Sequence, residues 1–182
     1  DNNPVIFVEH FKLYGQAGHV PARPYTVPFG KAKIIRAGKD ITLVGVSHMV
    51  TECLRAADYL KDAGVSAEVI DPVTLSPLDM TTIVRSVRKT GRLLVADTAW
   101  LTCGFTAEIV AGVVERLGKQ KARVERVGFA PVPAPTTESL LNLFYPNAHV
   151  VASKAYALVR GRKRNFSLDR RKGDDAMTSE RV

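Results

Sequence analysis

Residues 69–79, Val-Ile-Asp-Pro-Val-Thr-Leu-Ser-Pro-Leu-Asp, decide the fold class of this chain. They follow directly on an apolar run, 65–70, which the Asp-Pro pair ends. Ser76 is predicted to cap a helix, with Pro77 at the first helical position, where its missing N–H costs nothing, and Asp79 close to the positive helix end. The stretch therefore predicts a turn from a buried strand into a helix. On these residues alone the turn is architectural, with no chemistry of its own.

The same alternation of strand and helix continues along the chain. Near-continuous apolar runs rich in β-branched residues predict buried strands, and apolar residues at helical spacing predict the helices between them. The predicted strands are 4–9, 41–46, 65–70, 92–97 and 122–127, and the predicted helices are 50–60, 78–87, 104–117, 138–144 and 148–159. This order is typical of an α/β domain with a mostly parallel sheet and helices on both faces.

Two stretches lie outside this regular pattern. Residues 15–38 are dense in glycine and proline, which predicts a linker or crossing segment rather than a regular element. Residues 161–182 are basic and poor in apolar side chains, which predicts a disordered tail. The folded domain is therefore expected to span 39–160.

Composition narrows the classes of function. The 182 residues carry a net charge of +8, but from Arg160 onward eight basic and four acidic residues contribute half of it. We therefore assign half of the basic signal to a terminus rather than a groove, and do not expect a nucleic-acid partner. Cys53 and Cys103 have no metal-like spacing, and their apolar neighbours predict buried, reduced thiols. Reduced thiols favour a cytoplasmic protein, and no apolar run reaches the roughly 20 residues of a membrane span.

The loops after the predicted parallel strands are where ligands bind in such folds. They contain neither a G-x-G-x-x-G pattern nor a P-loop, so a nucleotide site has little support. His48, Asp71 and Asp97 could flank a small-molecule site there, which leaves open a stand-alone α/β enzyme or binding module. Cys103 precedes a helix start, a position that activates thiols, although packing is the better interpretation.

Large apolar side chains in one of these loops point to a protein interface instead. Trp100 and Leu101 lie in the loop, and Phe105 follows closely. Apolar residues grouped in an exposed loop mark contact with a partner more often than a small-ligand site. These three residues are our candidates for an interface.

Several segments resemble β subunits of thiamine-diphosphate-dependent 2-oxoacid dehydrogenases of the pyruvate, branched-chain and acetoin types. Tyr-Thr-Val-Pro-Phe-Gly-Lys-Ala at 25–32 resembles their Y-x-[IV]-P-[LF]-G-K-A segment, and 69–79 resembles V-I-D-x-R-T-L-S-P-L-D. Lys-Thr-Gly-Arg-Leu at 89–93 is similar to their K-T-G-R-L. Residues 133–146 are similar to a carboxyl-terminal pattern of some branches. The resemblance covers about 4–160.

The resemblance implies a transketolase-like carboxyl-terminal domain, with a three-layer α/β/α fold and a mixed five-stranded sheet. Residues 1–14 would then end a preceding pyrimidine-binding domain, and Glu9, His10 and Tyr14 join the interface candidates. The implied partners are the dehydrogenase α subunit, a second β subunit and the lipoyl acyltransferase core. Thiamine diphosphate and Mg²⁺ would bind outside this segment, which therefore contributes no catalytic residue. The implied location is the cytoplasm, or the mitochondrial matrix in a eukaryote.

The chain departs from the family pattern at several positions. Val73 stands where relatives usually have Arg, and Asp97-Thr98 replaces a pair of acids. Cys103 and Thr106 replace two glycines, which is expected to hinder close backbone approach at that turn. The basic tail has no counterpart in the family, so a nucleic-acid-binding module driven by the tail remains a third, less favoured hypothesis.

Overall fold

The computed structural model describes residues 4, 6 and 8–166. A single helical turn, η1 (Phe11–Leu13), precedes the regular elements. These follow in the order β1 (Lys33–Arg36), β2 (Ile41–Gly45), α1 (Met49–Asp62), β3 (Ala67–Asp71), α2 (Met80–Thr90), β4 (Arg92–Ala96), α3 (Phe105–Leu117), β5 (Arg123–Val127), α4 (Glu138–Phe144) and α5 (Ala148–Arg160). Within the described residues, no helix combines the length and the apolarity needed to cross a membrane.

The sheet has five strands in the order β1-β3-β2-β4-β5. β2 pairs in parallel with β3 and β4, and β4 pairs in parallel with β5, whereas β1 pairs antiparallel with β3. Leu43 on β2 is the centre of the register, opposite Val69 on one side and Leu94 on the other. The predicted α/β fold with a mostly parallel, mixed five-stranded sheet is confirmed.

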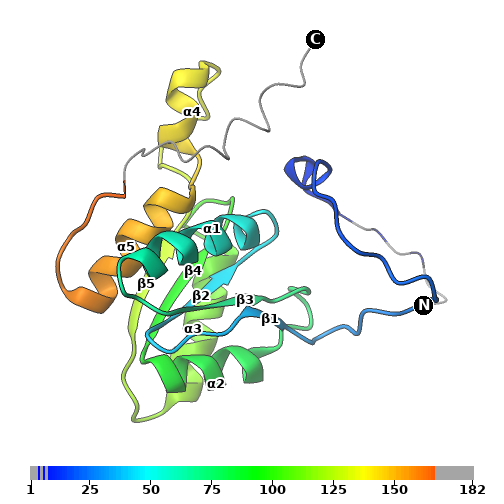
Figure 1. Ribbon diagram of the computed structural model, residues 1–182, viewed down its shortest axis with the longest axis horizontal. Helices are drawn as coiled ribbons and strands as arrows, with labels where there is room; N and C mark the ends of the chain where they lie inside the picture. Colours follow the sequence, from blue (N-terminus) through cyan, green and yellow to red (C-terminus); the bar gives the residue numbers. More distant parts are fainter. Residues whose placement is uncertain (1–3, 5, 7, 167–182) are drawn as a thin grey trace.

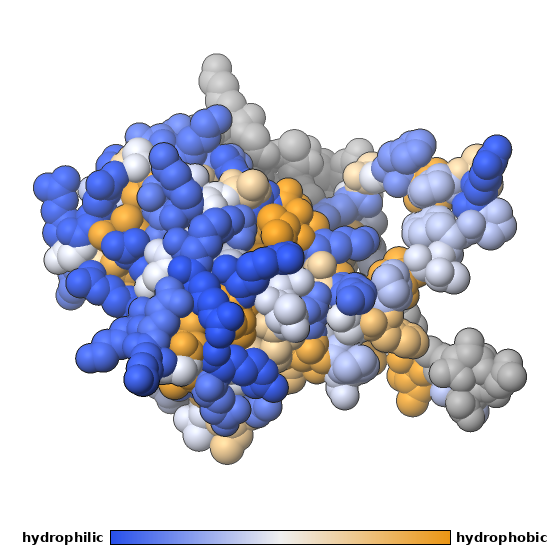
Figure 2. Space-filling model, turned by 90° about the horizontal axis from the view of Figure 1, so that it is seen from below, coloured by the Kyte–Doolittle hydropathy of each residue, from blue (hydrophilic) through white to orange (hydrophobic). Residues whose placement is uncertain are grey.

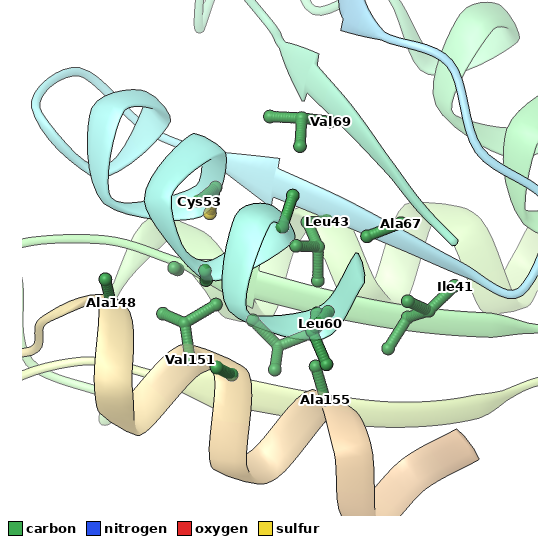
Figure 3. Packing of buried hydrophobic residues seen from close by; sticks show 14 of the residues in the cluster. Ile41, Leu43, Cys53, Leu60, Ala67, Val69, Ala148, Val151 and Ala155 are labelled. Atoms are coloured by element: carbon green, nitrogen blue, oxygen red, sulfur yellow. The ribbon is translucent and has the colours of Figure 1, made fainter. Parts of the chain in front are cut away.

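Helices cover both faces of the sheet, as Figure 1 shows. Alternate residues of each strand point to opposite faces, so Leu43 belongs to one core and Val44 to the other. The first core packs α1 and α5 on the sheet, and Figure 3 shows Leu60 of α1 beside Val151 and Ala155 of α5. The second packs α2 and α3 on the opposite face. This arrangement gives the three layers.

The turn at 71–79 has a different cap from the predicted one. α2 begins at Met80, and Asp79 is its cap, accepting a hydrogen bond from the backbone N–H of Thr82 at 3.0 Å. The prediction that Ser76 caps the helix, with Pro77 in its first turn, is wrong. Tertiary contacts explain why, because the other Asp79 oxygen accepts from the backbone N–H of Ala32 at 3.1 Å. The carboxylate thereby fastens two segments at once.

The amino-terminal part also differs from expectation. The predicted strand 4–9 is wrong, because its described residues have no strand geometry. A strand lies instead inside the predicted linker: β1 pairs with β3 through Ile34 and Ile70. Part of the tail is ordered as well, since Phe166 packs beside Tyr59 of α1. The remaining prediction of disorder, for 167–182, lies outside the described residues.

Candidate partner-binding surface

The amino-terminal segment exposes apolar side chains along most of its length. Figure 1 shows it in blue, extending away from the sheet. Its exposed large apolar residues are Ile6, Val8, Phe11, Tyr14, Val20, Tyr25, Val27 and Phe29. A soluble monomer rarely exposes so many together, so this segment is a candidate for contact with other protein surface.

The candidates Glu9, His10 and Tyr14 lie in this segment near the carboxyl end of the parallel strands. The His10 ring stacks on His48, which precedes α1, with 5.1 Å between centroids. A hydrogen bond to Glu9 raises the pKa of the Tyr14 hydroxyl above its ordinary value. Gln16 donates a hydrogen bond to the Thr51 hydroxyl at 2.9 Å, which ties the same segment to α1. The structure therefore brings these three candidates together, with Tyr14 well exposed.

A groove of about 770 Å³ lies between this segment and the strand ends, and we call it the carboxyl-edge groove. Its lining is mostly apolar and includes Leu13, Val46, Pro72 and Leu75. Asp71 lines it, but neither His48 nor Asp97 does. The three residues proposed for a small-molecule site are therefore not gathered around this groove.

Each of these three side chains interacts with its own neighbours rather than with the other two. An Asp71 oxygen accepts from the backbone N–H of Val73 at 2.8 Å. Burial lowers the pKa of His48, although the Glu52 carboxylate, 3.6 Å away, acts in the opposite direction. Burial raises the pKa of Asp97, although the Thr98 backbone N–H opposes the shift. Because the three are held separately, they form no acid–base pair.

The carboxyl-edge groove does not fit a thiamine diphosphate site either. A diphosphate needs cationic side chains or a bound divalent metal to balance its charge. Among the described residues, the lining contains Glu9 and Asp71 but no lysine or arginine. Among the described residues, no group of three histidine, cysteine or acidic side chains is placed to hold a metal ion. We therefore derive no catalytic step from these residues.

The loop candidates belong to a cluster of aromatic rings. Trp100, which is 45% exposed, meets Phe129 and Phe144 edge to face, both at 5.8 Å between centroids. Phe129 and Phe144 stack at 4.9 Å, and Tyr145 meets Phe129 at 5.2 Å. Lys12 of the amino-terminal segment lies 5.3 Å from the centre of the Tyr145 ring. The cluster thus joins the loop after β4, the end of β5 and α4.

Exposed aliphatic residues extend this cluster. Val132, Leu140 and Leu143 are 51%, 48% and 76% exposed. They lie on α4 or the loop before it, and Figure 1 shows α4, in yellow, projecting from the body of the domain. We call this set the aromatic surface: Trp100, Phe129, Val132, Leu140, Leu143 and Tyr145, together with the buried ring of Phe144 on which they rest. Its apolar side chains are too grouped to be scattered surface residues.

The other loop candidates are less exposed than the sequence indicates. Leu101 is half-buried and packs against Gly128. A Cβ added to Gly128 would lie 3.0 Å from the Leu101 side chain. Phe105 is half-buried against the second core. The prediction of two buried thiols is right for Cys53, whose pKa is raised by burial, and wrong for Cys103, which is exposed.

The turn before α3 keeps its tight backbone approach. Cys103 adopts the left-handed conformation, with φ of 57°. A Cβ on Gly104 would overlap the carbonyl oxygen of Trp100, so the close approach occurs at the glycine that remains. The Thr106 side chain is accommodated in a buried position. The close approach is therefore kept at Gly104, while Cys103 takes a left-handed φ and the buried Thr106 hydroxyl has no hydrogen-bond partner among the described residues.

Sequence reasoning missed every member of the aromatic surface except Trp100. Phe129 follows β5, and Phe144 and Tyr145 end α4, so the rings converge only in the folded chain. The Leu-Leu-Asn-Leu-Phe-Tyr stretch at 140–145 is the local signal that could have indicated it, because a helix this short cannot bury all its apolar residues.

The architecture assigns this domain to a fold class. It is a three-layer α/β/α domain with four parallel strands and an antiparallel edge strand. The chain belongs to the transketolase C-terminal domain family, whose model matches residues 30–151. The match begins before 39, the predicted domain start, and so takes in β1. The resemblance inferred from the sequence motifs is confirmed.

The relatives include β subunits of 2-oxoacid dehydrogenases. The acetoin:2,6-dichlorophenolindophenol oxidoreductase β subunit of Cupriavidus necator is 43% identical over 90% of this chain and 48% of its own length. The mitochondrial pyruvate dehydrogenase E1 β subunit of Pisum sativum is 41% identical over 85% of this chain and 45% of its own. The chain thus spans about half the length of the curated relatives it matches.

A solved structure agrees with this assignment. It is described as a split-gene transketolase, an inactive β4 tetramer. It is 28% identical and superposes with a TM-score of 0.66, over 75% of this chain and 45% of that one.

Proposed function

We propose that this domain is the assembly part of a 2-oxoacid dehydrogenase β subunit. The complete enzyme oxidatively decarboxylates a 2-oxoacid on thiamine diphosphate with Mg²⁺ and transfers the acyl group to a lipoyl domain. Both cofactors bind outside this segment. The names of the relatives support this assignment.

The aromatic surface is the observation that carries the proposal. It offers apolar rings already packed on one another, from Trp100 to Tyr145, so little side-chain entropy remains to be lost on binding. Aromatic anchors surrounded by aliphatic residues are typical of the energetic centre of a protein interface. Obligate interfaces of this type bury several thousand Å² and are rich in apolar residues.

The partners follow from the family role. We assign the aromatic surface, with Leu101 and Phe105 supporting it, to contact with the α subunit or a second β subunit. The amino-terminal segment, with Glu9, His10 and Tyr14, continues into the neighbouring pyrimidine-binding domain. The lipoyl acyltransferase core completes the assembly. We place the protein in the cytoplasm, or in the mitochondrial matrix of a eukaryote.

The test compares matched valine substitutions. Val132 lies in the aromatic surface and is 51% exposed, whereas Val114 lies on α3, outside that surface, and is 55% exposed. We expect V132D to weaken association of the chain, with itself or with a co-expressed α subunit, and V114D to leave it unchanged. Sedimentation velocity and co-purification measure the two associations.

Two results would contradict the proposal. One is a wild-type chain that is monomeric and fails to co-purify with the α subunit. The other is equal loss of association in V132D and V114D, since that would assign the effect to charge or stability rather than to the surface. Circular dichroism of both variants excludes unfolding as the cause.

A further inference from the structure

One edge of the domain concentrates its positive charge. The helices α1, α2, α3 and α5 end there, and β2, β4 and β5 begin there, so five turns meet at this amino edge of the sheet. The turns 38–41, 61–66, 88–92, 115–123 and 160–166 contain thirteen basic residues and three acidic ones. The basic residues are Lys39, Lys61, Arg88, Lys89, Arg92, Arg116, Lys119, Lys121, Arg123, Arg160, Arg162, Lys163 and Arg164, and the acidic ones are Asp40, Asp62 and Glu115. The expectation that half of the basic signal belongs to a terminus rather than a groove is therefore too simple.

Helix ends account for only part of this charge. Basic side chains in a last turn favour the negative end of a helix, and each of the four helices has at least one. The lysines Lys119, Lys121 and Lys163 and the arginines Arg123 and Arg164 lie beyond the helices, where this explanation does not reach. The positions of these five basic residues therefore need an explanation other than the helix dipole.

The arginine contacts leave the charge largely unneutralised. Arg92 donates to the carbonyl oxygens of Leu158 and Asp40, and Arg123 donates to that of Leu158 at 3.3 Å. Arg160 likewise donates to the carbonyl oxygen of Gly64 at 2.6 Å. A carbonyl orients a guanidinium without cancelling its charge, so these contacts hold the cations in place and keep the edge positive.

Part of this edge is hollowed into a basic groove. One hollow, of about 490 Å³, is lined by Arg92, Lys121 and Arg123. A second, of about 630 Å³, shares Arg123 and adds Lys154, Lys163 and Arg164, so the two lie on either side of Arg123. We call these six residues the basic groove. Figure 2 views the molecule from below, and strongly hydrophilic residues cover much of the left side of that face.

The groove also has features that suit a polypeptide. Ala157 and Leu158 give its second hollow an apolar floor. Glu125 is the acidic residue of the lining, and Lys154 pairs with it at 2.7 Å. β5 forms an edge of the sheet, the position at which an extended chain pairs, and among its backbone groups the Arg126 carbonyl oxygen already accepts from Lys154 at 3.3 Å. No aromatic side chain lines either hollow, so neither offers a stacking platform for bases.

We propose that the basic groove binds an acidic polypeptide segment, extended along β5, with carboxylates on the cations and apolar side chains on Ala157 and Leu158. The carboxylates would pair with Lys121 and Lys163, which have no ion pair in the described structure. This site is separate from the aromatic surface, and its existence does not depend on the proposed dehydrogenase role.

The test uses a fluorescein-labelled peptide of glutamate and leucine residues, with binding to the chain followed by anisotropy. Lys121 and Lys163 are exposed, so K121E/K163E removes groove charge without disturbing the core. The control R23E/K33E makes the same change in net charge at the amino-terminal segment and at β1, the opposite edge strand. We expect the groove variant to bind about tenfold more weakly and the control to remain close to wild type.

Further arms separate the alternatives. The same peptide with glutamine in place of glutamate should bind weakly. Added salt should lower the affinity of the chain for the acidic peptide. Equal weakening in both variants, or no binding of the acidic peptide to wild type, would overturn the proposal. Preferential binding of oligothymidylate would replace it with a nucleic-acid site. If circular dichroism shows that K121E/K163E does not fold, K121Q/K163Q gives the same comparison, because it removes the two charges without reversing them.

Discussion

The carboxylate of Glu52 accepts a hydrogen bond from the backbone N–H of Ala148, 96 residues later in the chain, at 2.8 Å. Glu52 lies in the first turn of α1 and is almost fully buried, and Ala148 is the first residue of α5. Arg55 pairs with the same carboxylate at 3.1 Å. A buried negative charge at the positive end of α5 therefore fixes the two helices of one layer to each other.

Removing this carboxylate should destabilise the domain. In E52A the Ala148 N–H and the Arg55 guanidinium both lose their partner, so we expect the free energy of unfolding to fall by about 2–3 kcal/mol. E52Q keeps an acceptor oxygen and should cost less. Urea unfolding followed by circular dichroism measures both. Identical unfolding midpoints for E52A and wild type would show that the contact is not stabilising.

The raised pKa of Asp97 predicts a dependence of stability on pH. Because its pKa in the folded chain lies above the ordinary value of 3.8, folding favours the protonated carboxyl. Stability is therefore lost as the pH rises from about that value through the folded pKa, and the full cost is present above the folded pKa. D97N has no charge to bury, so we expect it to raise the free energy of unfolding at pH 7 by on the order of 1 kcal/mol.

The pH comparison supplies the control for this prediction. The asparagine oxygen can still accept from the Thr98 backbone N–H, so D97N removes the charge and keeps the hydrogen bond. The difference between D97N and wild type should shrink as the pH falls toward 3.8. Thermal unfolding at several pH values measures it, and a difference independent of pH would refute the argument.

Gly104 packs directly against the backbone of Trp100, a member of the aromatic surface. A Cβ at this position would overlap the carbonyl oxygen of Trp100, and a backbone atom cannot move away cheaply. We expect G104A to lower the free energy of unfolding by at least about 2 kcal/mol and to weaken partner association. G18A is the control, because a Cβ there meets nothing within 4 Å. Equal stability of the two variants by thermal unfolding would count against this account.

Local sequence determined most of the core and little of the surface. Runs such as 92–97 mark buried strands because both faces of a parallel sheet are covered, and the structure has β4 there. β1 has only four residues, Lys33 to Arg36, all partly exposed, and only its pairing with β3 makes it a strand. The cap of α2 was similarly ambiguous, since Ser76 and Asp79 both suit it, and the distant Ala32 N–H decided between them.

The two candidate sites were harder to predict because their residues are dispersed along the chain. Trp100 indicated one site, but its ring partners Phe129 and Phe144 lie 29 and 44 positions away, and Tyr145 joins the cluster only through them. The basic groove takes its cations from the start of β4, the start of β5, α5 and the segment after it. In the sequence those cations are separated by neutral strands and helices, so only the basic residues of the tail formed a visible run.

Val73 stores strain in the loop that decides the fold. It is β-branched, yet its φ is 61°, a left-handed conformation that costs such side chains about 1–2 kcal/mol. Asn adopts this conformation more readily, and V73N keeps the backbone N–H that donates to Asp71. We therefore expect V73N to raise the free energy of unfolding by about 1 kcal/mol, measured by urea unfolding. V73A, which has no β-branch and still opposes the left-handed conformation, should fall between V73N and wild type. A loss of stability in V73N would mean that the Val73 side chain contributes packing that outweighs its strain.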